Sequence, residues 1–147
     1  MIRPATPADI PRLLELGEAM HGESRLRDIA FSREKVERLL TNLAAGKGCL
    51  LVAERDGEII GGFAGVLTPY YFSEEMMAVD LALFVSQDRR GGLAAVMLIR
   101  SFIEWAFQNG AREALLGTNF GAESKANQLY GRIGLGQVGG LFSSGVS

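Results

Sequence analysis

The chain has 147 residues, which suits one folded domain and leaves too little sequence for two. Hydrophobic residues make up 48% and charged residues 22%, values typical of globular domains, so the composition excludes a disordered chain. The net charge of -2 excludes an overall basic surface for nucleic acid, and no apolar run is long enough to span a membrane.

Neither the N-terminus nor the cysteine usage suggests an exported protein. The first residues lack the apolar segment of a signal peptide, so we expect a cytoplasmic protein. The single cysteine, Cys49, lies in an apolar run and is expected to be a buried hydrophobic side chain. No group of His, Cys, Asp and Glu has the spacing of a metal site, and we predict no metal.

The N-terminal third predicts a strand and two capped helices. Thr6 can cap the first helix, and Asp9, three residues later, can complete a capping box. Ser32 can cap the second helix in the same way. In order, the pattern predicts a strand over residues 1–3, a helix up to residue 20, a loop over 21–23 and a helix over 32–46.

The remaining residues predict strands joined first by a hairpin and then by helices. The apolar runs 49–54 and 58–67 are separated by Asp-Gly, the strongest short signal of a hairpin. The later elements are predicted as a strand over 77–85, a mostly buried helix over 92–109, a strand over 113–117, a helix over 122–133 and a glycine-rich strand over 135–142. This order, β-α-α-β-β-β-α-β-α-β, predicts an α/β fold with a mixed sheet and helices on its faces.

Residues 87–94, between a predicted strand and the long helix, are the segment with the clearest functional pattern. Glycines let the main chain approach a ligand, and the first N–H groups of a helix have no partner within it. With two arginines beside them, these groups predict a site for a phosphate-bearing ligand. The competing interpretation is a glycine-rich turn with two solvated arginines.

The segment from Arg89 to Ala94 also fits the R/Q-x-x-G-x-G/A pattern of the GNAT superfamily, the acyl-CoA-dependent N-acyltransferases. About 40 residues later the segment LYGRIGL, ending at Leu135, resembles the family's closing LYxxxGF, with Leu in place of Phe. The resemblance implies a single GNAT-like domain over residues 1–147 that uses acetyl-CoA as acyl donor. The residues that it implies for cofactor binding are Phe84, Val85, Arg89, Arg90, Gly91, Gly92, Leu93 and Ala94.

The same resemblance implies a role for Tyr130 as the group that protonates the leaving sulfur. Asp80 or Glu75 is the candidate base, and His21 and Glu23 are the candidates for binding the acceptor. Each has a simpler interpretation, because exposed carboxylates and a lone histidine are usually solvated, and ordered water can replace a base.

The acceptor is expected to be an amine of a small molecule or peptide, with no nucleic acid or membrane as partner. Polyamines, aminoglycosides, amino acids and protein amines all remain open. An acyl-CoA sensor without catalysis, and a site for another phosphate ligand such as a nucleotide, are the alternative functions. The aromatic loop over 70–72 and the last predicted strand could support a homodimer.

Overall fold

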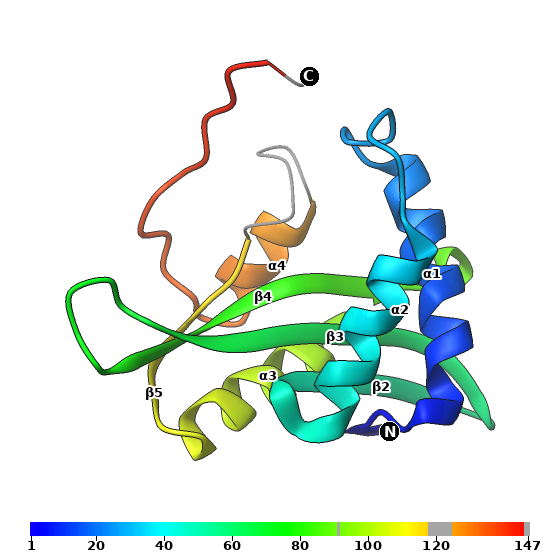
Figure 1. Cartoon of the computed structure of the whole chain (residues 1–147), viewed down its shortest axis with the longest axis horizontal. Helices are drawn as coiled ribbons and strands as arrows, with labels where there is room; N and C mark the ends of the chain where they lie inside the picture. Colours follow the sequence, from blue (N-terminus) through cyan, green and yellow to red (C-terminus); the bar gives the residue numbers. More distant parts are fainter. Residues whose placement is uncertain (91, 118–124, 146–147) are drawn as a thin grey trace.

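The computed structural model describes residues 1–90, 92–117 and 125–145. They form a five-stranded mixed sheet with helices on both faces, which confirms the predicted fold class (Figure 1). The strands are β1 (Ile2–Pro4), β2 (Cys49–Arg55), β3 (Glu58–Pro69), β4 (Met76–Val85) and β5 (Ala111–Leu115). The helices are α1 (Ile10–Glu23), α2 (Arg33–Asn42), α3 (Ala94–Gln108) and α4 (Lys125–Arg132), with short helical turns at Pro7–Asp9, Leu43–Lys47 and Gln87–Arg89.

The strands follow one another across the sheet in the order β1-β2-β3-β4-β5. All neighbours are antiparallel except β4 and β5, which are parallel and are joined through α3. The predicted hairpin between β2 and β3 is confirmed, because Asp56 and Gly57 both have positive φ, at 53° and 77°. These angles are those of a two-residue turn whose twist matches that of the strands.

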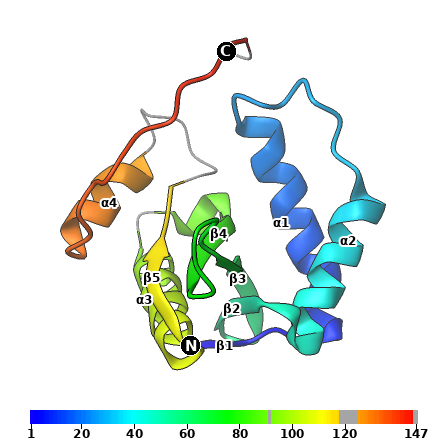
Figure 2. The same cartoon turned by 60° about the vertical axis from the view of Figure 1, so that its left-hand side comes forward.

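Two apolar layers enclose the sheet, and Figure 2 shows the helices that lie on its two faces. α1 and α2 cover one face, while α3 and α4 lie toward the other. α3 comes very close to the sheet at Gly65, where an added Cβ would lie 2.3 Å from Phe102 Cε1. The absence of a side chain there lets Phe102 stack on Phe63 with ring centroids 4.4 Å apart.

Two predicted helices differ from the observed ones. The predicted loop over residues 21–23 is wrong, because α1 continues to Glu23 and closes with a hydrogen bond from Ser24 N to His21 O. The long helix begins at Ala94 instead of residue 92 and buries only one face. Leu93 and Phe107, which the pattern places on its buried part, are exposed, and so is Met97.

The predicted last strand over residues 135–142 is wrong, since these residues form no strand. Val138, Leu141 and Phe142 are exposed there. Glycine disfavours regular strand backbone, and the described residues provide no partner for this segment. The preceding helix is confirmed over Lys125–Arg132 and is followed by Gly134 at positive φ, whereas its predicted start at 122–124 lies outside the described residues.

Candidate active site

The neighbouring strands β4 and β5 part halfway along β4. Their pairing ends at Val79 opposite Leu115, whereas β3 pairs with β4 as far as Val85. Within the described chain, residues 82–85 therefore have a strand partner only on the β3 side. Their other main-chain edge can form hydrogen bonds to a ligand, as an exposed strand edge can to another strand.

A β-bulge in β4 coincides with this separation. Ala64 pairs with Ala82 and Gly65 with Asp80, so that Leu81 is an extra residue on β4. Leu81 and Ala82 both pack with the layer of α1 and α2. Asp80, opposite Gly65, lies on the α3 side. Bulges bend a strand and redirect its side chains, and this one redirects β4 where its pairing with β5 ends.

Two of the predicted catalytic residues, Asp80 and Tyr130, come together at this point. The Tyr130 ring lies against Gly117, just after β5, and its hydroxyl is buried without a hydrogen-bond partner among the described residues. Asp80 is 3% exposed, and its Oδ2 accepts a hydrogen bond from Gly117 N at 3.0 Å. Burial and, next, the charge of Asp80 raise the pKa of Tyr130. The phenol therefore stays protonated at neutral pH and can donate a proton.

The predicted phosphate site lies between the end of β4 and α3. A helical turn over Gln87–Arg89 leads into it, and a hydrogen bond between Ser86 and Asp88 closes that turn and lowers the pKa of Asp88. Leu93 and Gly92 are exposed, no side chain caps α3, and the first turn of α3 contains no acidic residue. The amides at the start of α3 thus have no capping side chain, while predicted contact Gly91 lies outside the described residues.

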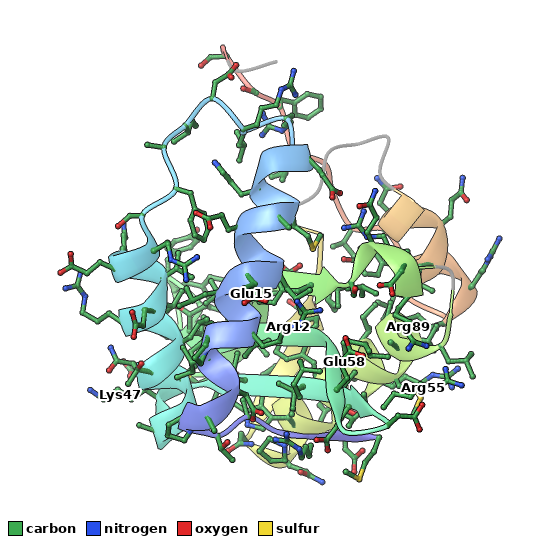
Figure 3. All side chains as sticks on the ribbon, turned by 90° about the vertical axis from the view of Figure 1, so that its right-hand side faces the viewer. Arg12, Glu15, Lys47, Arg55, Glu58 and Arg89 are labelled. Carbon is green, nitrogen blue, oxygen red and sulfur yellow. The ribbon has the colours of Figure 1, made fainter. Side chains whose placement is uncertain are left out.

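Arginine side chains surround this turn on the face shared with α1. The positive charges of Arg89 and Arg12 both lower the pKa of Asp88. Figure 3 shows Arg89 on the turn beside α1, and Arg12 on α1 itself. Arg90, like Arg12, bonds to protein groups: its Nη1 lies 2.7 Å from Glu23 Oε2, and its Nε donates to Val85 O at 3.2 Å, while Arg12 Nη1 lies 3.0 Å from Glu15 Oε2. The structure thus pairs a predicted cofactor residue with a predicted acceptor residue.

A cavity of about 550 Å³ lies between α1, α2 and the strands β3 and β4. His21 and Glu23, the predicted acceptor residues, both line it, together with residues 81–84 of β4. His21 Nε2 lies 2.6 Å from Ile29 O, and its ring contacts Phe31. His21 therefore also holds the loop that follows α1 against the cavity.

Several cavity residues were not singled out in the sequence. Met20, Phe31 and Leu39 line it, although Met20 and Leu39 lie in the apolar stripes of their helices. The signal available in the sequence was the helical spacing of the apolar residues Val36, Leu39, Leu40 and Leu43. In the structure Leu40 is buried, whereas Leu39 is 39% exposed. The amide of Gly117, which binds Asp80, carries no signal in the sequence because it belongs to the main chain.

Three further predicted residues remain. Glu75 lies away from Asp80 and Tyr130, and Phe84 and Val85 could contact a ligand only through their main chain. Glu75 directly precedes β4 and is paired with Arg112 at 3.4 Å. Strand geometry places it roughly 15 Å from Asp80. Phe84 and Val85 are buried, so their side chains pack in the two core layers and only their main chain is open to a ligand.

Other kinds of site receive no support from the described residues. Cys49 is 2% exposed on β2, and burial raises the pKa of its thiol to about 12, which makes it unreactive at neutral pH. No group of three or more His, Cys, Asp and Glu side chains in the described ranges could hold a metal ion. None of the described helices has the length and apolar character needed to cross a membrane.

Comparison with solved structures finds the same fold in several proteins, acetyltransferases among them. A mutant of the BH1408 protein from Bacillus halodurans has a TM-score of 0.79 at 19% identity, covering 100% of this chain and 99% of that one. An aminoglycoside acetyltransferase, meta-AAC0020, from an uncultured soil metagenomic sample has a TM-score of 0.71 at 19% identity, covering 98% and 95%. A ribosomal-protein-alanine N-acetyltransferase from Brucella melitensis has a TM-score of 0.74 at 23% identity, covering 90% and 82%.

Sequence comparison assigns the family. No curated protein matches the chain. The sequence model of the Acetyltransferase (GNAT) family matches residues 16–135, which include the turn before α3, the separation of β4 and β5, and Tyr130. The match covers most of the chain and agrees with the fold of the solved acetyltransferases. The chain therefore belongs to the GNAT family of acyl-CoA-dependent N-acetyltransferases.

Proposed function

We propose that this protein transfers an acetyl group from acetyl-CoA to a primary amine, by direct attack of the amine while both substrates are bound. The observation that supports this most strongly is the Tyr130 hydroxyl, which is buried, protonated and without a partner among the described residues. A buried polar atom of this kind is rare in folded proteins and is expected to meet a ligand.

The described residues offer groups that suit two parts of coenzyme A. The amides at the start of α3, with Arg89 beside them, would hold its diphosphate. The open edge of β4 at residues 82–85 would form hydrogen bonds to its pantetheine arm. Bound there, coenzyme A supplies the acetyl group as an activated thioester.

The residues at the end of this edge can move the protons that the transfer requires. The amine nitrogen forms a bond to the carbonyl carbon as the bond from carbon to sulfur breaks. Tyr130 donates its proton to the sulfur, and Asp80 accepts the proton that the amine loses. A proton then passes from Asp80 to the phenolate, directly or through solvent, which restores both groups. Glu75, which precedes β4 and is paired with Arg112, takes no part in these steps.

The state of the thiol also supports direct attack. An acyl-cysteine intermediate requires a reactive thiolate, and the chain contains only Cys49. Its side chain is buried, and its pKa of about 12 keeps it protonated. The amine must therefore attack the thioester itself or an acyl group carried by some residue other than cysteine. Attack on the thioester itself requires no additional nucleophile from the protein.

The test is the substitution Tyr130→Phe. It removes the proton donor and preserves the ring, so we expect kcat to fall more than tenfold while the Kd for coenzyme A stays unchanged. Thiol release from acetyl-CoA with an amine mixture measures kcat, and calorimetry measures the Kd. Tyr71→Phe is the matched control, because Tyr71 is fully exposed on the loop between β3 and β4.

Two outcomes would contradict this proposal in different ways. If Tyr130→Phe turns over at the wild-type rate, Tyr130 is not the proton donor. If the wild-type protein binds coenzyme A but releases no thiol with any amine, the protein is an acyl-CoA sensor without catalysis.

A further inference from the structure

The cavity between α1, α2 and the sheet has walls that are mostly apolar. Its volume of about 550 Å³ lies within the range of small-molecule sites. The side chains that enclose its body include Met20 from α1, Phe31 from the following loop, and Val36, Leu39 and Leu40 from α2. Such walls favour a ligand whose main part is apolar over a ligand that is polar throughout.

The polar side chains of the lining gather near the C-terminal end of α1, and each already has a partner in the protein. His21 Nε2 contacts Ile29 O, and Ser24 Oγ donates to His21 O at 2.8 Å. Glu23 Oε2 accepts a hydrogen bond from Arg90 at 2.7 Å. A ligand in this cavity therefore finds few polar groups that it can bind without breaking a bond inside the protein.

The charge of the cavity lining also disfavours a ligand that carries several positive charges. Among the described residues, Glu23 is the one carboxylate that lines the cavity, and the guanidinium of Arg90 balances it. A ligand with several ammonium groups would bury positive charge without matching carboxylates, which is unfavourable. A ligand with a single amine can place that group at the open edge of β4 and leave its body among the apolar side chains.

We propose that the acceptor is a primary amine on a single apolar body, aliphatic or aromatic, with no second positive charge. This inference rests on the proposed acetyl transfer and narrows its acceptor. Residues 81–84 line the cavity, and residues 82–85 form the open edge of β4, so the cavity borders the place proposed for the acetyl group. Polyamines and aminoglycosides are thereby excluded as preferred acceptors.

A pair of amines of equal length tests the inference. We expect hexylamine to be acetylated with a kcat/KM at least tenfold above that of 1,6-diaminohexane, which differs only by a second ammonium group. Each methylene added from butylamine to hexylamine should raise kcat/KM about fourfold if it becomes fully buried. Thiol release from acetyl-CoA and mass spectrometry of the product measure both effects, with spermidine and sisomicin as polycationic acceptors.

A charged substitution in the wall gives the reciprocal test. Leu39→Glu places a carboxylate in the lining at a position that is already 39% exposed, so the fold should tolerate it. We expect this variant to reduce the preference for hexylamine over the diamine at least tenfold. Phe107→Glu is the matched control, since Phe107 is 56% exposed on α3, outside the cavity lining, and its variant should keep the wild-type preference.

The possible failures are distinguishable. If the diamine, spermidine or sisomicin has a higher kcat/KM than hexylamine, the acceptor class is wrong and the acetyl transfer stands. If coenzyme A binds and no amine releases thiol, the proposed transfer itself fails, and the inference fails with it. If Leu39→Glu remains folded by circular dichroism and keeps the wild-type preference, the acceptor does not occupy this cavity.

Discussion

Asp80 and Asp9 are the buried acidic side chains in the part of the chain that the structure describes, and their surroundings differ. Asp9 is paired with an arginine, whereas Asp80 accepts an amide hydrogen bond beside a buried phenol. If Asp80 accepts the proton of the amine, Asp80→Asn should lower kcat at least tenfold. The asparagine oxygen can still accept from Gly117 N, so coenzyme A affinity should be unchanged. Thiol release and calorimetry measure the two quantities.

Glu75→Gln is the control for Asp80→Asn, because it makes the same chemical change at the other candidate carboxylate. Glu75 is exposed and paired with Arg112, away from Tyr130, and its variant should retain the wild-type kcat. The opposite result, with Glu75→Gln slow and Asp80→Asn at the wild-type rate, would exchange the roles of the two residues. Wild-type rates in both variants would point to ordered water as the proton acceptor.

At the residue scale, the sequence could identify Tyr130 and the turn before α3 because each belongs to a continuous motif. It could not show whether Asp80 or Glu75 is the better candidate for the base, because that depends on the point along β4 at which the pairing with β5 ends. The ion pair of Glu23 and Arg90 joins positions 67 residues apart and requires α1 to extend to Glu23. Contacts of this kind depend on tertiary packing, which no local pattern contains.

At the scale of elements, an ion pair between a buried carboxylate, Asp9, and a half-buried arginine, Arg3, stabilises the start of α1. Arg3 on β1 donates to both oxygens of Asp9, at 2.8 and 3.0 Å, and Thr6 N donates to Asp9 Oδ2 at 2.8 Å. The hydrogen bonds from Arg3 lower the pKa of Asp9 to about 2. An unfolded aspartate has a pKa of about 3.9, so the pair contributes about 2 to 3 kcal/mol to the free energy of unfolding above that pH.

This contribution predicts a specific acid sensitivity. A lowered pKa in the folded state means that stability is present above pH 4 and is lost as the pH falls through about 2. Asp9→Asn should therefore lower the free energy of unfolding by about 2 to 3 kcal/mol at pH 7 and by much less at pH 2. Urea unfolding followed by circular dichroism measures both values. Asp28→Asn, at an exposed loop position, should change neither by more than about 0.5 kcal/mol. An equal loss in Asp9→Asn at both pH values would show that the charge of Asp9 is not what anchors α1.

The elements themselves were predictable where local and tertiary preferences agree. The turn at Asp56 and Gly57 and the cap at Ser32, which accepts from Lys35 N, are encoded within a few residues and are observed. The predicted strand over 135–142 failed because a strand needs a partner, and its apolar residues say nothing about where that partner lies. α1 continues through residues 21–23, which were predicted as a loop. Gly22 does not end the helix there, and Ser24 Oγ donates to His21 O at the end of α1.

At the scale of the whole molecule, the proposed position of coenzyme A joins parts of the chain that are distant in sequence. It would contact the start of α3, the open edge of β4 and Tyr130 on α4, and these lie together only in the folded state. Ligands that bind only the folded state stabilise it by about 2.7 kcal/mol at a concentration of 100 times the Kd. For a domain of this size we expect the Tm to rise by roughly 5 to 10 °C with coenzyme A.

The charge at the turn before α3 should contribute much of this shift, because the diphosphate that we place there carries two negative charges. Arg89→Glu replaces a favourable charge with a repulsive one and should reduce the rise in Tm by more than half at the same coenzyme A concentration. Arg38→Glu makes the same change on the outer face of α2 and should leave the rise intact. Differential scanning fluorimetry with coenzyme A and, separately, ATP measures these shifts. A larger rise with ATP than with coenzyme A would mean that the turn binds a nucleotide, and equal loss in both variants would mean that overall charge, not this turn, governs binding.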